Sequence, residues 1–381
     1  MDFSLNEEQE LLRQTVREFA ENEIKPLREE LDEKEEFSIP LTQKMADLGL
    51  FGILIPPEYD GMQMDYLSYC IVVEELARVD GCQAATVAAG NSLGSCPIAC
   101  YGSEEQKKAL LPELAAGKLW GFGLTEPNAG SDAGGTQTTA VKKSDKWILN
   151  GSKIFITNAA TDITLGSTIQ TVTGEREGGK KVYTCFLVKQ DTPGYSAKPM
   201  HKKMTWRSSN TAEIYLEDVE LTDADILGGE GEGFHQMLET LDSGRLAIAA
   251  MGVGGAQGAL ETAVAYAKER RQFGRPIGKF QALAFRMADM ATEVEAARSL
   301  LYRACWLKDS GRPFSMEAAM IKLYASEVMK RAADGAVQIL GGYGLMEEYP
   351  AAKFYRDQRL LEIGEGTSEM QRLVISRKLG L

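Results

Sequence analysis

The stretch KWILNGSKIFIT, residues 146–157, determines how the rest of the chain is divided. Two short runs, 146–149 and 154–157, are rich in the β-branched and aromatic residues that favour strands. Between them lies Asn150-Gly151, a dipeptide typical of the two-residue turn of a β-hairpin. The stretch therefore predicts two antiparallel strands joined by a tight turn.

Further strand signals surround this stretch, and helical signals flank them. Gly, Thr, Ser and Asn become frequent from Gly121 onward, and strand runs follow at 182–188 and 212–217. Apolar residues recur at helical spacing elsewhere, from the capping pattern at Asn6 to Pro26, then at 41–49, 66–79, 104–116, 235–271, 281–309 and 315–340. We predict a mainly helical α+β fold with an N-terminal helical domain, a central antiparallel β domain and a C-terminal helical bundle, covering residues 1–120, 121–232 and 233–381.

The charge balance argues against a nucleic-acid partner. The 55 Asp and Glu residues outnumber the 42 Lys and Arg residues, which gives a net charge of −13 at pH 7. This is the wrong sign for a surface that binds phosphate backbones. The longest basic run, residues 201–203, is too short to define such a surface.

The sequence predicts neither membrane insertion nor a metal site. The N-terminus lacks the basic and apolar segments of a secretory signal, and no apolar run approaches the roughly 20 residues that span a bilayer. We therefore expect a cytoplasmic protein. The six scattered cysteines are predicted to be reduced, and neither of the two histidines adjoins Cys96 and Cys100 to complete a zinc site.

A glycine-rich stretch, GVGGAQG at residues 252–258, nearly matches the dinucleotide-binding fingerprint. Gln257 stands where the third glycine belongs, and the preceding sequence is helical rather than strand-like. No GK[ST] phosphate-binding motif is present either. We interpret the stretch as small residues that let helices pack closely.

A second motif, GNSLG at residues 90–94, matches the G-x-S-x-G nucleophile pattern of serine hydrolases. That motif needs a preceding strand, whereas residues 83–89 are alanine-rich and compatible with a helix. A hydrolase using Ser92, with His201 or His235 as its base, is kept as an alternative function.

Three separated segments carry the most specific signal. They are FGLTEPNAGSD at 122–132, RRQFG at 270–274, and QILGGYG at 338–344 leading to EGTS at 365–368. Together they resemble the acyl-CoA dehydrogenase family. FITN at 155–158 and WRSSNT at 206–211 fit the same pattern, so the resemblance covers essentially the whole chain.

The resemblance implies an FAD-dependent enzyme that oxidises an acyl-CoA to the 2-enoyl-CoA, passes a hydride to flavin N5 and delivers electrons to an electron-transfer flavoprotein. It also implies a homotetramer, with FAD bound between domains and across a subunit interface. The residues that it assigns to FAD are Phe122, Leu124, Thr125, Ser131, Phe155, Thr157, Arg270, Phe273, Gln281, Gln338, Gly342 and Thr367. Those assigned to the substrate are Ser131, Asp242, Arg245, Gly364 and Gly366.

The chemistry of these residue types suits the assigned tasks. By resemblance, the hydroxyls of Thr125 and Thr157 donate to the isoalloxazine edge, and Phe155 replaces an aromatic residue that lies against the ring. Hydroxyl and backbone donors stabilise the negative charge that a flavin accepts, and an arginine such as Arg270 balances a pyrophosphate. Only the whole set, not any single threonine, supports a flavin site.

Glu365 is the predicted catalytic base. Removing the α-proton of a thioester requires a carboxylate whose pKa burial raises toward neutrality. Gly364 and Gly366 flank Glu365, so the backbone can approach a ligand closely. Glu362 and Glu369 are nearby rivals, and the family pattern favours Glu365. By resemblance, the Glu365 backbone N–H and a ribityl hydroxyl polarise the thioester carbonyl.

Departures from the family pattern bear on the substrate. One subclass carries its base at the position of Gly244, which has no side chain to act, and glutaryl-type enzymes carry an arginine at the position of Ala84. Gly364 replaces a common tyrosine and widens the space beside the base. We therefore predict a short, branched or cyclic acyl-CoA. The alternatives are a straight short-chain, butyryl-type substrate, and a helical scaffold that keeps the fold without the chemistry.

Overall fold

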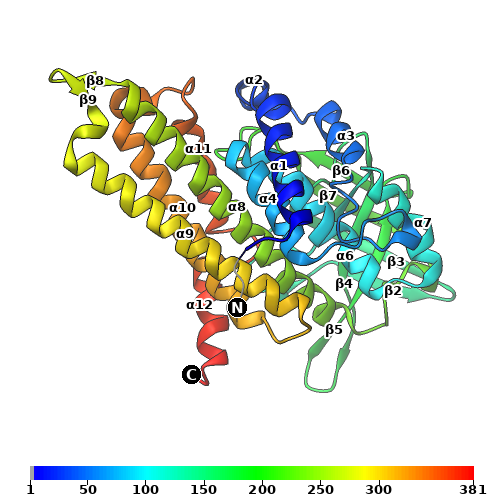
Figure 1. Ribbon diagram of the computed structural model, residues 1–381. Coiled ribbons are helices and arrows are strands. Elements are labelled where there is room, and N and C mark those ends of the chain that lie inside the picture. The colour runs from blue at the N-terminus through cyan, green and yellow to red at the C-terminus, as the bar shows by residue number, and fades with distance from the viewer. Residues whose placement is uncertain (1–3) are drawn as a thin grey trace.

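A computed structural model describes residues 4–381, and its N-terminal part is helical (Figure 1). Asn6 caps the first helix and forms a capping box with Gln9, as predicted. The helices are α1 (Glu7–Phe19), α2 (Arg28–Lys34), α3 (Ile39–Asp47), α4 (Tyr66–Val79), α5 (Gly81–Ala89), α6 (Cys96–Tyr101) and α7 (Glu104–Ala115), with π-helical turns at Ala20–Ile24 and Gly90–Ser95. The predicted bounds of α4 are met at both ends.

The central part is a seven-stranded sheet, and its strands are β1 (Leu119–Gly123), β2 (Thr139–Lys143), β3 (Lys146–Thr157), β4 (Thr164–Arg176), β5 (Lys180–Lys189), β6 (Tyr195–Pro199) and β7 (Thr211–Leu221). Their order is β1-β4-β2-β3-β7-β6, with β5 paired to β4. The predicted fold class is confirmed, but the sheet is mixed because β4 pairs in parallel with β1 and β2. Long connections separate these parallel partners, as parallel pairing requires.

The predicted hairpin turn at Asn150-Gly151 is wrong. β3 runs without a break through all twelve residues of KWILNGSKIFIT, and the turn from β2 lies earlier, at residues 144–145. Gly151 instead sits at a register irregularity against β7, with φ +147°, where a Cβ would lie 2.6 Å from the Thr138 hydroxyl oxygen. Asn-Gly therefore serves a bulge in the strand, which also favours glycine.

The C-terminal part returns to helices, which are α8 (Gly233–Glu269), α9 (Gln281–Asp309), α10 (Ser315–Leu340), α11 (Pro350–Leu361) and α12 (Ser368–Lys378). The bounds of α9 and α10 are those predicted. Between α8 and α9, the short strands β8 (Arg271–Gln272) and β9 (Arg275–Pro276) form a hairpin at the end of the bundle that lies away from the sheet (Figure 1). No helix within residues 4–381 has the length and apolarity needed to cross a bilayer.

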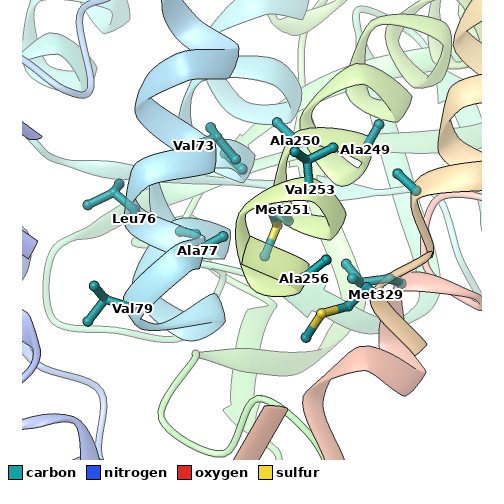
Figure 2. Close-up of a cluster of buried hydrophobic side chains, with 14 of the residues drawn as sticks. Val73, Leu76, Ala77, Val79, Ala249, Ala250, Met251, Val253, Ala256 and Met329 are labelled. Carbon is teal, nitrogen blue, oxygen red and sulfur yellow. The ribbon is translucent and has the colours of Figure 1, made fainter. Parts of the chain in front are cut away.

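One apolar core joins the N-terminal and C-terminal helices. Figure 2 shows α4 against α8, with Met329 of α10 beside them. The close approach needs glycine: a Cβ at Gly254 or at Gly258 would lie 2.1 Å from a backbone oxygen of α4. This confirms that GVGGAQG is a helix-packing segment rather than a dinucleotide-binding loop.

A buried ionic cluster centred on Lys353 of α11 ties the N-terminal helices to the bundle. The ammonium lies 2.5 Å from Asp357, 3.1 Å from Asp80 and 3.6 Å from Asp32. Cys82, Asp80 and Asp357 are close enough together to hold a metal ion. The Lys353 ammonium already lies among them, 3.4 Å from the Cys82 sulfur, and supplies the positive charge.

Candidate active site

Glu365 lies in a tight turn between α11 and α12. Glu365 has φ +52° and Gly366 has φ +93°, so two consecutive residues adopt the left-handed conformation. Thr367 ends the turn by capping α12, its hydroxyl accepting from the Met370 N–H at 3.3 Å. The turn directs the carboxylate at α8, where a Cβ added to Gly244 would lie 2.1 Å from Oε2 of Glu365. Glycine at 244 therefore leaves room for the Glu365 carboxylate.

The environment of Glu365 favours proton transfer near neutral pH. Its Oε2 is buried and has no hydrogen-bond partner among the described residues. Burial raises the pKa of Glu365 to about 7, against the opposing effect of the Lys322 and Arg245 cations. A carboxylate with a pKa near the working pH is suited to act as a general base.

Next to this carboxylate, α8 carries the predicted pair Asp242 and Arg245. They form an ion pair one helical turn apart, and Arg245 is buried. Sequence reasoning missed two neighbours: the Tyr66 hydroxyl donates to the Ser243 carbonyl at 3.0 Å, and Lys308 donates to the Ser243 hydroxyl at 2.8 Å. Only the fold brings these residues from α4 and α9 to the same segment of α8.

The central sheet brings Thr125, Phe155 and Thr157 together. The Ile154 N–H donates to the Thr125 carbonyl at 3.0 Å, which holds the loop after β1 beside β3. Within residues 4–381, neither threonine hydroxyl makes a hydrogen bond to the protein. Phe155 has φ +61° and is 61% exposed. An exposed aromatic ring on β3, with one unbonded hydroxyl two residues further along the strand and another on the adjoining loop, suits the face and edge of a flavin ring.

Two other predicted cofactor residues, at the end of β1 and at the start of this loop, face the protein interior. The side chains of Phe122 and Leu124 are largely buried in the apolar core, at 9% and 8% exposure. The loop is supported by a buried ion pair that the sequence did not suggest: Lys153 lies 2.7 Å from Glu126 and 3.3 Å from the Leu124 carbonyl. Ser131 is exposed at the end of this loop.

The remaining predicted FAD residues of the bundle form a separate, exposed group. Arg270 begins the β8–β9 hairpin, and its guanidinium lies 5.7 Å from the ring of Tyr343, which follows Gly342. Gln281 and Gln338 are exposed at the adjoining ends of α9 and α10, and Phe273 at the hairpin tip is 92% exposed. Figure 1 places this end of the bundle away from the sheet, so one chain does not bring the two groups together.

The structure does not support the hydrolase alternative. Ser92 lies in the π-helical turn after α5, not after a strand. It is fully buried, and its hydroxyl donates to the Ala88 carbonyl at 2.8 Å. His201 and His235 are both exposed. A nucleophilic serine needs an accessible hydroxyl and a base beside it.

The space that the sequence suggested beside Gly364 is partly filled. A Cβ at Gly364 would lie 3.1 Å from a side-chain methyl carbon of Leu360. The prediction of a branched or cyclic substrate rested on that space, and this contact weakens it. Ala84, at the position where glutaryl-type enzymes carry an arginine, is buried on α5.

Comparisons with known proteins match nearly the whole length of the chain. Models of the acyl-CoA dehydrogenase N-terminal, middle and C-terminal domains match residues 6–118, 121–219 and 231–380. A probable acyl-CoA dehydrogenase of Bacillus subtilis is 50% identical and a short-chain specific acyl-CoA dehydrogenase of Clostridium acetobutylicum 46% identical, each over 100% of both chains. The solved butyryl-CoA dehydrogenase of Megasphaera elsdenii is 41% identical, with a TM-score of 0.96 over 100% of both chains. The chain therefore belongs to the acyl-CoA dehydrogenase family and is an FAD-dependent oxidoreductase of that class.

Proposed function

We propose that the enzyme oxidises a short, straight-chain acyl-CoA of the butyryl type at its α and β carbons, with Glu365 as the base. The observation that carries this proposal is the Glu365 carboxylate, whose Oε2 is buried without a hydrogen-bond partner among the described residues, whose pKa burial raises to about 7, and which lies against Gly244. The straight-chain alternative replaces the branched or cyclic prediction because Leu360 narrows the space at Gly364 and similar enzymes are named for short chains.

Each residue of the site then has a defined task. Bound FAD supplies the acceptor for the β-hydride. Phe155 would lie against the flavin ring, and the hydroxyls of Thr125 and Thr157 would donate hydrogen bonds to it. Glu365 removes the α-proton through its carboxylate and polarises the thioester carbonyl through its backbone N–H.

We also propose a homotetramer, because the exposed group at the β8–β9 end needs a partner. Phe273, Leu345 and Leu379 are large apolar residues of the C-terminal part that are at least 60% exposed. Such residues on one part of a chain are typical of subunit contacts.

We propose that residues 1–120, 121–232 and 233–381 form the three domains of each subunit. We also propose an electron-transfer flavoprotein as the electron acceptor. The cytoplasmic location stays a prediction.

Turnover with a panel of thioesters tests the proposed function. With a dye as electron acceptor, butyryl-CoA should be used more efficiently than palmitoyl-CoA, isobutyryl-CoA or a cyclic acyl-CoA. One or two methylenes in an apolar pocket change the barrier by about 1–3 kcal/mol, so the preference should be graded. A preference for palmitoyl-CoA or for the branched and cyclic thioesters would contradict the assignment. A purified protein without flavin absorbance would favour the inactive scaffold.

Replacing Arg270 should weaken FAD retention and subunit association together. Arg270→Ala removes an exposed guanidinium that has no carboxylate partner within residues 4–381. Losing a charge-assisted hydrogen bond to a pyrophosphate should cost about 1.5–3 kcal/mol of binding. Flavin content and size-exclusion volume are measured on the same sample.

Arg312→Ala is the matched control, because Arg312 is also exposed and also lies over an aromatic ring, at 5.2 Å from that of Trp306. It should retain its flavin. An Arg270→Ala enzyme that is fully loaded with FAD and of unchanged size would refute the two-subunit site.

A further inference from the structure

Lys322 of α10 is fully buried, at 0% exposure, although lysine is among the residues least often found inside proteins. Its ammonium donates to the Gly366 carbonyl at 2.6 Å, immediately after Glu365 in the chain. Within residues 4–381, no carboxylate lies within ion-pair distance of this ammonium. Removing a lysine charge from water is costly unless another group needs that charge.

The Gly366 carbonyl fixes the turn that carries the base. It accepts from Lys322 and also from the Gln371 side-chain amide, at 2.8 Å. Both donors are fully buried, and they come from α10 and α12. Glu365 and Gly366 both have positive φ. Such backbone conformations carry strain, so the surrounding contacts must stabilise them.

The charged groups around Glu365 come from several elements. Arg245 of α8 and Lys322 of α10 are the cations whose charges act to lower the pKa of Glu365, and the Glu365 charge in turn raises the pKa of Tyr69 of α4. Arg245 already has Asp242 as its ion-pair partner. Lys322 has no ion-pair partner among the described residues, so its positive charge is less neutralised than that of Arg245.

Two further carboxylates act on Lys322 more weakly than Glu365 does. Glu362 is paired with Lys330 and Arg359, and Glu369 is exposed on α12. Burial lowers the pKa of Lys322 to about 8, while Glu365 opposes this effect. Lys322 is thus mostly protonated at neutral pH and loses its charge only in alkaline solution.

We propose that Lys322 is a positioning residue for the dehydrogenation: its ammonium holds the turn that presents Glu365 and supplies the positive charge that stabilises the ionised carboxylate. This inference rests on the proposed function, in which Glu365 is the base. Lys322 acts through Glu365 and has no contact with the reacting atoms.

The test separates the charge of Lys322 from its hydrogen bond. Lys322→Gln keeps an amide that can donate to the Gly366 carbonyl but removes the charge, whereas Lys322→Met removes both. Losing a nearby opposite charge should raise the pKa of a carboxylate by about one unit or more. The pH at which kcat/KM is half-maximal should rise by the same amount in Lys322→Gln, and the rate at pH 7 should fall about fivefold.

Rates at high pH distinguish this role from damage to the fold. By about pH 9 the carboxylate is ionised in both proteins, so Lys322→Gln should approach the parent rate. Lys322→Met should stay slower at every pH because its turn is also loosened. Flavin content, thermal unfolding and exchange of the α-proton of butyryl-CoA with D2O are measured on each variant.

Lys330→Met is the matched control, since Lys330 lies on the same helix, is exposed and pairs with Glu362 at 3.4 Å. The pH profile of Lys330→Met should match that of the parent enzyme.

The proposal would be overturned by a Lys322→Gln enzyme whose kcat/KM is half-maximal at the parent pH, whether its rate falls uniformly or not at all. If neither neutral variant folds, Lys322→Arg, which keeps the charge, must keep the parent half-maximal pH. A failure of the proposed function looks different, because Glu365→Gln would then still exchange the α-proton.

Discussion

Glu365→Gln should keep its FAD and lose most of its turnover. The amide has the size of the carboxylate and fits the same space over Gly244, but it cannot accept the α-proton. Losing a positioned general base usually costs about 10²-fold or more in rate. Stopped-flow bleaching of the flavin by butyryl-CoA and exchange of the α-proton with D2O both report this step, whereas flavin absorbance reports retention of the cofactor.

Glu369→Gln is the matched control, because it makes the same change four residues away on an exposed carboxylate. Hydrogen bonds from its own backbone N–H and from Thr367 lower the pKa of Glu369, which makes it a weaker base than Glu365. Its turnover should stay within a few-fold of the parent. Proton exchange by Glu365→Gln at close to the parent rate would show that another residue is the base, and Glu362 would be examined next.

The predictable part of the fold is the part where the local pattern and tertiary packing agree. The apolar spacing of 66–79, 281–309 and 315–340 predicted α4, α9 and α10 at the bounds observed. Asn150-Gly151 misled because the dipeptide fits both a hairpin turn and a strand bulge. Which of the two forms depends on pairing with β7, more than 60 residues further along the chain.

The site was predictable only as a set of residues, not as an arrangement. Glu365 was found by family resemblance together with the need for a carboxylate of raised pKa, and burial in the structure raises its pKa to about 7. Lys322 was missed, although it lies on the buried face of α10 with Ala318, Ala325 and Met329. The signal available in the sequence was a lysine among apolar residues on the core-facing side of the helix. Its approach to Gly366 depends on packing between distant segments.

Lys353→Met should destabilise the protein more than any surface change. It leaves Asp80 and Asp357 buried without their cation, whereas Asp32 keeps its ion pair with Arg356. Breaking a buried ion pair by removing one partner typically costs about 3–5 kcal/mol in the free energy of unfolding. Burial alone would lower the pKa of Lys353, but Asp357 and Asp80 more than reverse this and raise it. Its contribution is therefore complete below about pH 10 and is lost only above that.

Lys34→Met provides the control for this change. Lys34 forms an ion pair with Glu30 at the same four-residue helical spacing as Lys353 and Asp357, but Lys34 and Glu30 are both exposed. An exposed ion pair of this kind contributes little to stability, so the urea midpoint of unfolding should hardly move.

Unfolding is followed by circular dichroism at one protein concentration and with excess FAD, since ligand and subunit binding both shift the midpoint. Equal midpoints for Lys353→Met and Lys34→Met would mean that the cluster around Lys353 does not tie α2, α5 and α11 together. A large loss confined to Lys353→Met would identify this cluster as the electrostatic link between the N-terminal helices and the bundle.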